Sequence, residues 1–249
     1  MNPFLISLIV FACVLGGALL GLFLHSRLPD DHLASDTKDV VRLAMGLVAT
    51  TVALALGLLI GSAKSFFDTQ NAEIAQLAAN AVSLDRLLAQ FGPDANDARQ
   101  RLRTVVSGFN RLTLGQNNEA DSTVQQARGD EMLEAIQVLS PQTDNQRSLK
   151  NNAVALAIQM GQTRWLMFEQ RAVPVPTILL GVLTFWLVAL FISFGVFVKP
   201  NATLITGLVV SAFAVSAAIF LIIEMYHPYS RLIQVSNEPI RAAIAQLGH

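Results

Sequence analysis

Four long stretches of the chain contain no Asp, Glu, Lys or Arg, and they constrain the fold more than any other feature of the sequence. They cover residues 3–24, 43–62, 172–198 and 202–223. A helix needs about 20 predominantly apolar residues to cross the hydrocarbon core of a bilayer. Each stretch meets that length, so the sequence predicts four transmembrane helices, with an outer loop at 25–42.

The composition follows from these stretches. Hydrophobic residues make up 53% of the chain and charged residues only 14%, whereas a soluble domain carries about 25% charged residues. This excludes a single water-soluble globule, and the high hydrophobicity excludes a disordered chain. The formal net charge is −1, and no long run of Lys or Arg occurs. We therefore expect the lipid bilayer, and not nucleic acid, as a partner.

The segment 63–171, between the second and third stretches, has the periodicity of helices and no alternating strand pattern. A heptad register is clearest in its first part, where Gln70 alone breaks it; the apolar positions are Phe67, Ile74, Leu77, Ala81, Leu84, Leu88 and Phe91. Gly92 and Pro93 then predict the end of the helix. No breaker separates this pattern from the second stretch, so residues 43–91 are expected to form one helix.

These features predict an all-α integral membrane protein with four parts. Transmembrane helices 1 and 2 occupy 1–62, and a helical water-facing domain, continuous with helix 2, occupies 63–171. Residues 172–223 form a hairpin of transmembrane helices 3 and 4, and 224–249 form an amphipathic C-terminal tail.

Small residues recur every four positions in the second stretch, at Ala49, Ala53, Gly57 and Gly61, and the first stretch has Gly17 and Gly21. Such spacing lets two helix backbones approach closely, so these are helix-packing candidates. Two interpretations remain open. The first two helices pack on each other, or the second helix lines a central axis formed by several copies.

In the second interpretation, another face of the second helix presents Thr51, Leu54, Leu58 and Phe66 to the axis as candidate pore-lining residues. Hydrophobic constrictions of this kind gate ions by dewetting. Glu224 and His227, at the end of the fourth stretch, are candidates for a pore mouth or for a contact with the water-facing domain. A snorkelling end cap of the helix is the alternative.

No motif for catalysis, cofactor binding or metal binding appears, so we expect no enzyme activity, no cofactor and no metal. The chain has a single cysteine, Cys13, which lies inside the first stretch. One thiol cannot form an intrachain disulfide or a cysteine-based metal site. An apolar filler in a membrane helix is its expected role.

Several segments resemble the bacterial bestrophin-like family of membrane proteins, and the match spans nearly the whole chain. The resembling segments are 28–33, 36–42, 46–64, 73–80, 84–88, 220–224, 227–229 and 236–241. The order of elements also agrees: two spans, a helical domain, two spans and an amphipathic tail. The second span nevertheless has Val52, Leu54, Leu56 and Leu58 where animal bestrophins have an aromatic-rich neck.

The resemblance implies a homo-oligomeric ion channel, with a pentamer favoured, a pore lined by the second span and small inorganic ions as the permeant species. It also implies a bacterial inner membrane, with the 63–171 domain and both termini in the cytoplasm. The alternative is a non-conducting membrane scaffold or sensor that uses the helical domain for docking. The short tail after the fourth span argues against a receptor with an output domain.

Overall fold

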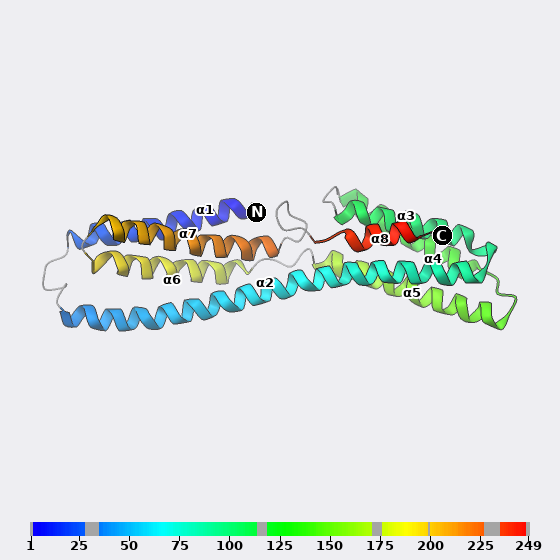
Figure 1. Cartoon of the computed structure of the whole chain (residues 1–249), viewed down its shortest axis with the longest axis horizontal. Coiled ribbons are helices and arrows are strands. Elements are labelled where there is room, and N and C mark those ends of the chain that lie inside the picture. The colour runs from blue at the N-terminus through cyan, green and yellow to red at the C-terminus, as the bar shows by residue number, and fades with distance from the viewer. Residues whose placement is uncertain are drawn as a thin grey trace. The chain divides into compact units, whose positions relative to one another are not determined.

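A computed structural model describes residues 2–27, 35–113, 119–170, 176–198, 200–226 and 235–247. All elements in these ranges are helices, and the described residues contain no strand (Figure 1). The helices are α1 Pro3–His25, α2 Ser35–Phe91, the 3₁₀ turn η2 Pro93–Ala95, α3 Asn96–Thr113, α4 Glu119–Val138, α5 Asp144–Gln170, α6 Thr177–Val196, α7 Ala202–Met225 and α8 Glu238–Gln246. The predicted all-α class is confirmed.

The chain divides into two compact units. We call residues 1–66 with 174–226 the span unit, and residues 67–173 with 227–249 the helical unit. Helix α2 contributes its first part to the span unit and its second part to the helical unit. Among the described residues, four helices are long and apolar enough to cross a membrane: α1, α2, α6 and α7.

In the span unit, α1 lies beside both α6 and α7 (Figure 1). Fully buried apolar side chains form the centre of this unit, among them Val14, Leu183, Ala212 and Ile219. Polar end caps fix where two of the helices begin. The Asn2 side chain accepts a hydrogen bond from the Phe4 amide, and the Asn201 side chain accepts one from the Leu204 amide at 2.7 Å. Such caps satisfy amides that have no partner inside the helix.

The helix α1 lies close to α6 at two of its glycines, Gly17 and Gly21. A Cβ on Gly17 would lie 3.0 Å from the Val188 side chain, and one on Gly21 would overlap the Ile192 carbonyl oxygen. The partner of Gly17 and Gly21 is therefore α6 and not α2. Within the described part of one chain, the small residues of α1 therefore do not pack on those of α2. The α6 residue at the same approach is Gly195, which no repeat in the sequence had indicated.

Two of the hydrogen bonds in the described part of the span unit join α1 to helices that lie far from it in sequence. The Ser216 hydroxyl of α7 donates to the Ser7 carbonyl of α1 at 2.5 Å, between buried residues. The His25 ring Nδ1 lies 2.8 Å from the Val196 carbonyl oxygen, which joins the end of α1 to the end of α6. A hydroxyl or imidazole away from water needs such a partner, because an unpaired polar group there is costly.

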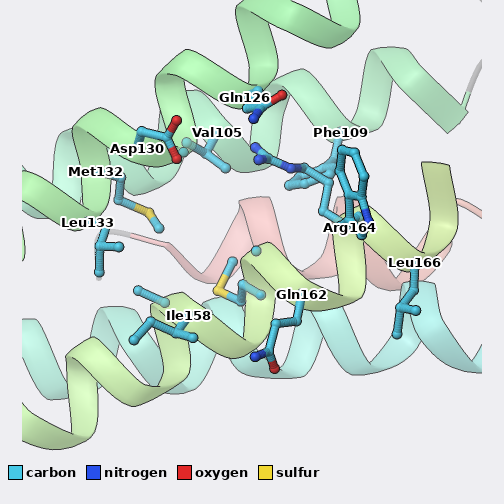
Figure 2. A pocket seen from close by; sticks show the side chains of 15 residues that line it. Val105, Phe109, Gln126, Asp130, Met132, Leu133, Ile158, Gln162, Arg164 and Leu166 are labelled. Carbon is cyan, nitrogen blue, oxygen red and sulfur yellow. The ribbon is translucent and has the colours of Figure 1, made fainter. Parts of the chain in front are cut away.

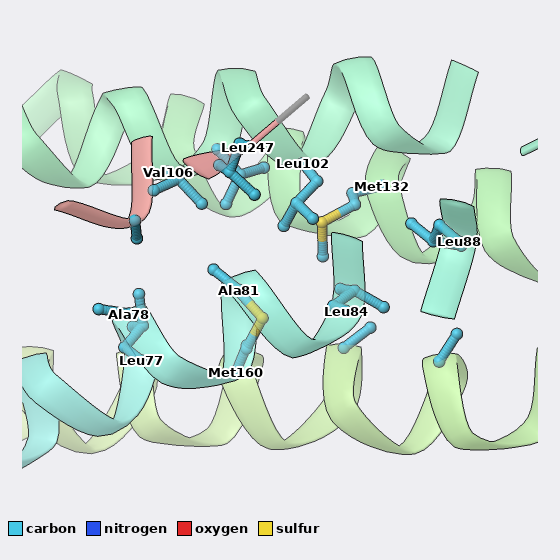
Figure 3. Close-up of a cluster of buried hydrophobic side chains, with 14 of the residues drawn as sticks. Leu77, Ala78, Ala81, Leu84, Leu88, Leu102, Val106, Met132, Met160 and Leu247 are labelled. Carbon is cyan, nitrogen blue, oxygen red and sulfur yellow. The ribbon is translucent and has the colours of Figure 1, made fainter. Parts of the chain in front are cut away.

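In the helical unit, the second part of α2 packs against α3, α4, α5 and α8 around one apolar core (Figure 3). The predicted heptad positions from Ile74 to Phe91 are all buried in it, and Phe67 is half-buried. Gln70, the residue that breaks the heptad, is also buried. The helix ends where predicted, since Gly92 has φ 118°, a conformation that other residues rarely adopt.

An ion pair fastens α2 to α3 at the edge of this core. Arg99 donates to both Asp85 carboxylate oxygens, Nε at 2.8 Å and Nη2 at 2.9 Å. The hydrogen bonds to Asp85 raise the pKa of the Arg99 guanidinium, and burial opposes them. Charge-assisted pairs with two parallel hydrogen bonds are stronger and more directional than neutral ones.

The structure differs from the sequence-based boundaries at two places. Helix α2 begins at Ser35, inside the segment 25–42 that was expected to be a loop. The second difference lies at the C-terminal tail, because α7 continues to Met225 and the tail itself contains a helix, α8. Its residues Ile240 and Ala243 are buried in the core of the helical unit, together with Val235 and Leu247. The amphipathic pattern of the tail therefore serves that core.

Candidate functional site

The part of α2 in the span unit packs against the other described residues of its chain along one narrow face. Val52, Leu59 and Ala63 are buried, and Met45, Val48 and Leu56 are half-buried beside them. In its most apolar window, 11% of α2 residues are buried, compared with 33% in α1, 33% in α6 and 28% in α7. Within one chain, α2 is thus the least covered of the four candidate spans.

Three of the four candidate pore-lining residues share an uncovered face of α2. Thr51, Leu54 and Leu58 are exposed, the two leucines at 71% and 76%. Successive residues of a helix are rotated by about 100°, which places these three side chains together on one side of the helix, next to the buried face. The Thr51 hydroxyl donates to the Leu47 carbonyl at 3.0 Å, so its proton is satisfied inside the helix.

Phe66 does not belong to this face. It is half-buried, and its ring stacks on that of Tyr226 with centroids 5.5 Å apart and planes at 27°. The Tyr226 hydroxyl also shares a hydrogen bond with the Ser62 hydroxyl, with the oxygens 3.1 Å apart. The end of α7 is thereby attached to α2 by both a ring contact and a hydrogen bond. Sequence reasoning missed this contact, because the spacing of residues on α2 gave no information about α7.

The small residues of α2 occupy the opposite flank of its buried face. Ala49 is half-buried, whereas Ala53, Gly57 and Gly61 are exposed. A Cβ added to Gly57 or Gly61 would meet no atom of the described residues within 4 Å. Neither glycine is therefore required by packing inside one chain, although each weakens the helix relative to alanine.

Glu224 is buried, with 3% of its surface exposed. Its carboxyl does not extend into solvent, so it is not a snorkelling end cap. His227, its expected companion, lies outside the described residues. The described residues also contain no group of three or more His, Cys, Asp or Glu side chains that could hold a metal ion. Cys13 is exposed on α1.

Comparison with known proteins places this architecture in a family. The model of the bestrophin-like domain matches residues 12–240. In fold, the chain is similar to the crystal structure of a bacterial bestrophin homologue from Klebsiella pneumoniae that carries a point mutation. The TM-score is 0.60 at 14% sequence identity, and the match covers 96% of this chain and 97% of that one. No curated protein matches the chain. Since the family model covers most of its length, the chain belongs to the bestrophin-like family.

Proposed function

We propose that several copies of the chain assemble into an ion channel whose pore is lined by α2. Membership of the bestrophin-like family supports this, and the observation that carries it is the incomplete packing of α2. One narrow face of the helix packs on its own chain, and both flanks remain uncovered.

The two flanks differ in chemistry, and each suits a different neighbour. The flank with Ala53, Gly57 and Gly61 permits close approach of a second backbone, which is how helices associate in a bilayer. We assign it to the contact with an adjacent copy. The flank with Thr51, Leu54 and Leu58 is then directed to the axis of the assembly.

The pore proposed here is hydrophobic. The stretch 43–62 has no charged residue, so permeation would depend on the width and wetting of a ring of leucines. No charged relay inside the bilayer is available to it. We propose small inorganic ions as the permeant species. The resemblance to bestrophins supports our further proposal of a pentamer in a bacterial inner membrane with a cytoplasmic helical unit.

Phe66 and Glu224 take different roles in this proposal. Because Phe66 stacks on Tyr226, it is assigned to holding α2 at its bundle and not to the pore surface. Glu224 is buried in the last turn of α7, so we propose that it acts on the inner end of the pore indirectly, by holding α7 in place. His227 remains a proposed pore-mouth residue.

Recording currents from purified protein in planar bilayers tests the proposal. We expect discrete conductance steps under gradients of Na⁺, K⁺ or Cl⁻. Gly57→Leu should lower the size of the assembly and abolish the steps, because the new side chain occupies the proposed contact. Gly181→Leu in α6 is the matched control, since a Cβ there also meets nothing within 4 Å. Silence from an intact assembly would refute conduction and favour the scaffold alternative.

A further inference from the structure

A pocket of about 600 Å³ lies in the helical unit, between α3, α4 and α5 (Figure 2). This volume falls within the range of about 300–1,000 Å³ that is usual for small-molecule sites. Its walls are largely apolar, with Phe109 from α3, Met132 and Leu133 from α4, and Ile158 and Trp165 from α5. The two charged groups among its described lining residues are Arg164 and Asp130.

Arg164 brings a positive charge into this apolar environment. Its Nη1 donates to the main-chain carbonyl of Gln125 in α4 at 2.7 Å, which fixes one edge of the guanidinium. Burial lowers the pKa of Arg164, and the charge of Asp130 opposes that shift. Asp130 is itself exposed, and among the ion pairs of the described residues none joins the two. The guanidinium therefore carries a desolvation cost that an anion in the pocket would offset.

Two glycines in helix interiors leave room in the pocket wall. At Gly129 of α4, a Cβ would lie 2.6 Å from Arg164 Nη1, so the missing side chain makes space for the guanidinium. At Gly161 of α5, a Cβ would meet no atom within 4 Å. A glycine inside a helix costs about 0.5–1 kcal/mol relative to alanine, and packing within the chain accounts for only one of the two.

We propose that this α4–α5 pocket binds a small amphipathic carboxylate, with its anionic end at Arg164 and its hydrocarbon body against Met132, Leu133 and Ile158. The charged Arg164 and the apolar walls of the pocket together favour a ligand that has both an anionic and a hydrocarbon part. A guanidinium matches the geometry of a carboxylate, and the flexible methionine adapts to a chain of variable shape. A second copy of the chain fits less well, because an apolar surface there would bury Arg164 without a counter-charge.

Fluorescence of the full-length protein provides the test. The chain has two tryptophans, Trp165 and Trp186, so Trp186→Phe leaves the pocket residue as the only indole. Trp165 is 56% exposed, which leaves its emission free to respond. Decanoate, added below its micelle concentration to protein in lipid nanodiscs, should change this emission saturably. Decanol and acetate, which lack the charge and the hydrocarbon body respectively, should have no saturable effect.

Two variants separate binding from nonspecific partitioning. Arg164→Gln should weaken decanoate binding by at least about tenfold, and Arg164→Lys should restore part of it. Gly161→Leu should abolish binding by filling the pocket, and it covers the case in which Arg164→Gln fails to fold. Gly181→Leu, in the span unit, should bind like the parent protein.

Three results would overturn the proposal. The first is an equal titration with decanol, and the second is unchanged affinity in Arg164→Gln; both would show that the pocket takes up only hydrocarbon. The third is that iodide fails to quench the fluorescence of Trp165 in the assembled, ligand-free protein. That result would mean that a second copy covers the pocket. None of these results depends on whether the assembly conducts ions.

Discussion

Adding one methyl group at Gly21 should loosen the contact between α1 and α6. The new Cβ would overlap the Ile192 carbonyl oxygen and lie 3.0 Å from the Gly195 Cα. Both obstacles are backbone atoms, so no side-chain rotation can relieve the overlap. The two helices must move apart, and the buried contacts on either side of the glycines weaken with them.

The size of the effect follows from overpacking in other cores, which typically costs about 1–3 kcal/mol. For a chain of this length, each kcal/mol lowers the unfolding midpoint by about 2–4 °C. Gly21→Ala should therefore lower the midpoint by roughly 2–12 °C. Gly16→Ala is the matched control in the same helix, because a Cβ there meets nothing within 4 Å. It should leave the midpoint unchanged or raise it, since alanine favours the helix.

Trp186 fluorescence reports on this contact, because Trp186 lies on α6 and is partly buried in the core of the span unit. The experiment uses a Trp165→Phe background and thermal unfolding in detergent. Equal midpoints for Gly21→Ala and Gly16→Ala would refute the close approach of α1 to α6. Gly195→Ala provides an independent check, because its Cβ would lie 2.6 Å from the Ala18 carbonyl oxygen.

Two further predictions concern α2. Arg99→Met should destabilise the helical unit by about 3 kcal/mol in urea unfolding, because it breaks a partly buried ion pair in which the Asp85 side chain is only 6% exposed. The double variant with Asp85→Leu should recover most of that loss, and a merely additive loss would argue against the pair. Because the folded pKa of Arg99 is raised, its contribution is lost only above the ordinary arginine pKa, so the difference should stay constant between about pH 6 and pH 9. Tyr226→Phe should cost about 0.5–1.5 kcal/mol through the lost hydrogen bond to Ser62. A double-mutant cycle with Ser62→Ala measures this coupling, and zero coupling would contradict the contact.

Much of the fold could be predicted from local pattern. The uncharged stretches gave the four candidate spans, and the heptad from Phe67 to Phe91 identified the side of α2 that enters the core of the helical unit. The spacing of apolar residues reflects which side of a single helix is buried, so a single sequence is enough to predict that side. The start of α2 was mistaken because the charged residues between 36 and 42 resemble a solvated loop, although charges are equally compatible with the first turns of a helix.

What the sequence could not provide was the identity of contacts between helices. Gly17 and Gly21 form a recognisable packing motif, yet nothing in their spacing distinguishes α6 from α2 as the partner. Gly195 could not be identified for the same reason. Likewise, Phe66 was grouped with Leu54 and Leu58 although it stacks on Tyr226. The α4–α5 pocket combines residues from three helices, so no single segment carries its signal.

Cysteine accessibility tests most directly whether assembled copies conduct ions along the leucine face of α2, as we propose. Cys13 is the single cysteine, so Cys13→Ala provides a background without thiols. In planar bilayers, a charged methanethiosulfonate reagent should block the current of Leu58→Cys and leave that of Phe213→Cys unchanged. Phe213 is exposed on α7, a helix that does not line the proposed pore. A current that is equally insensitive in both variants, or blocked in both, would contradict a pore lined by α2.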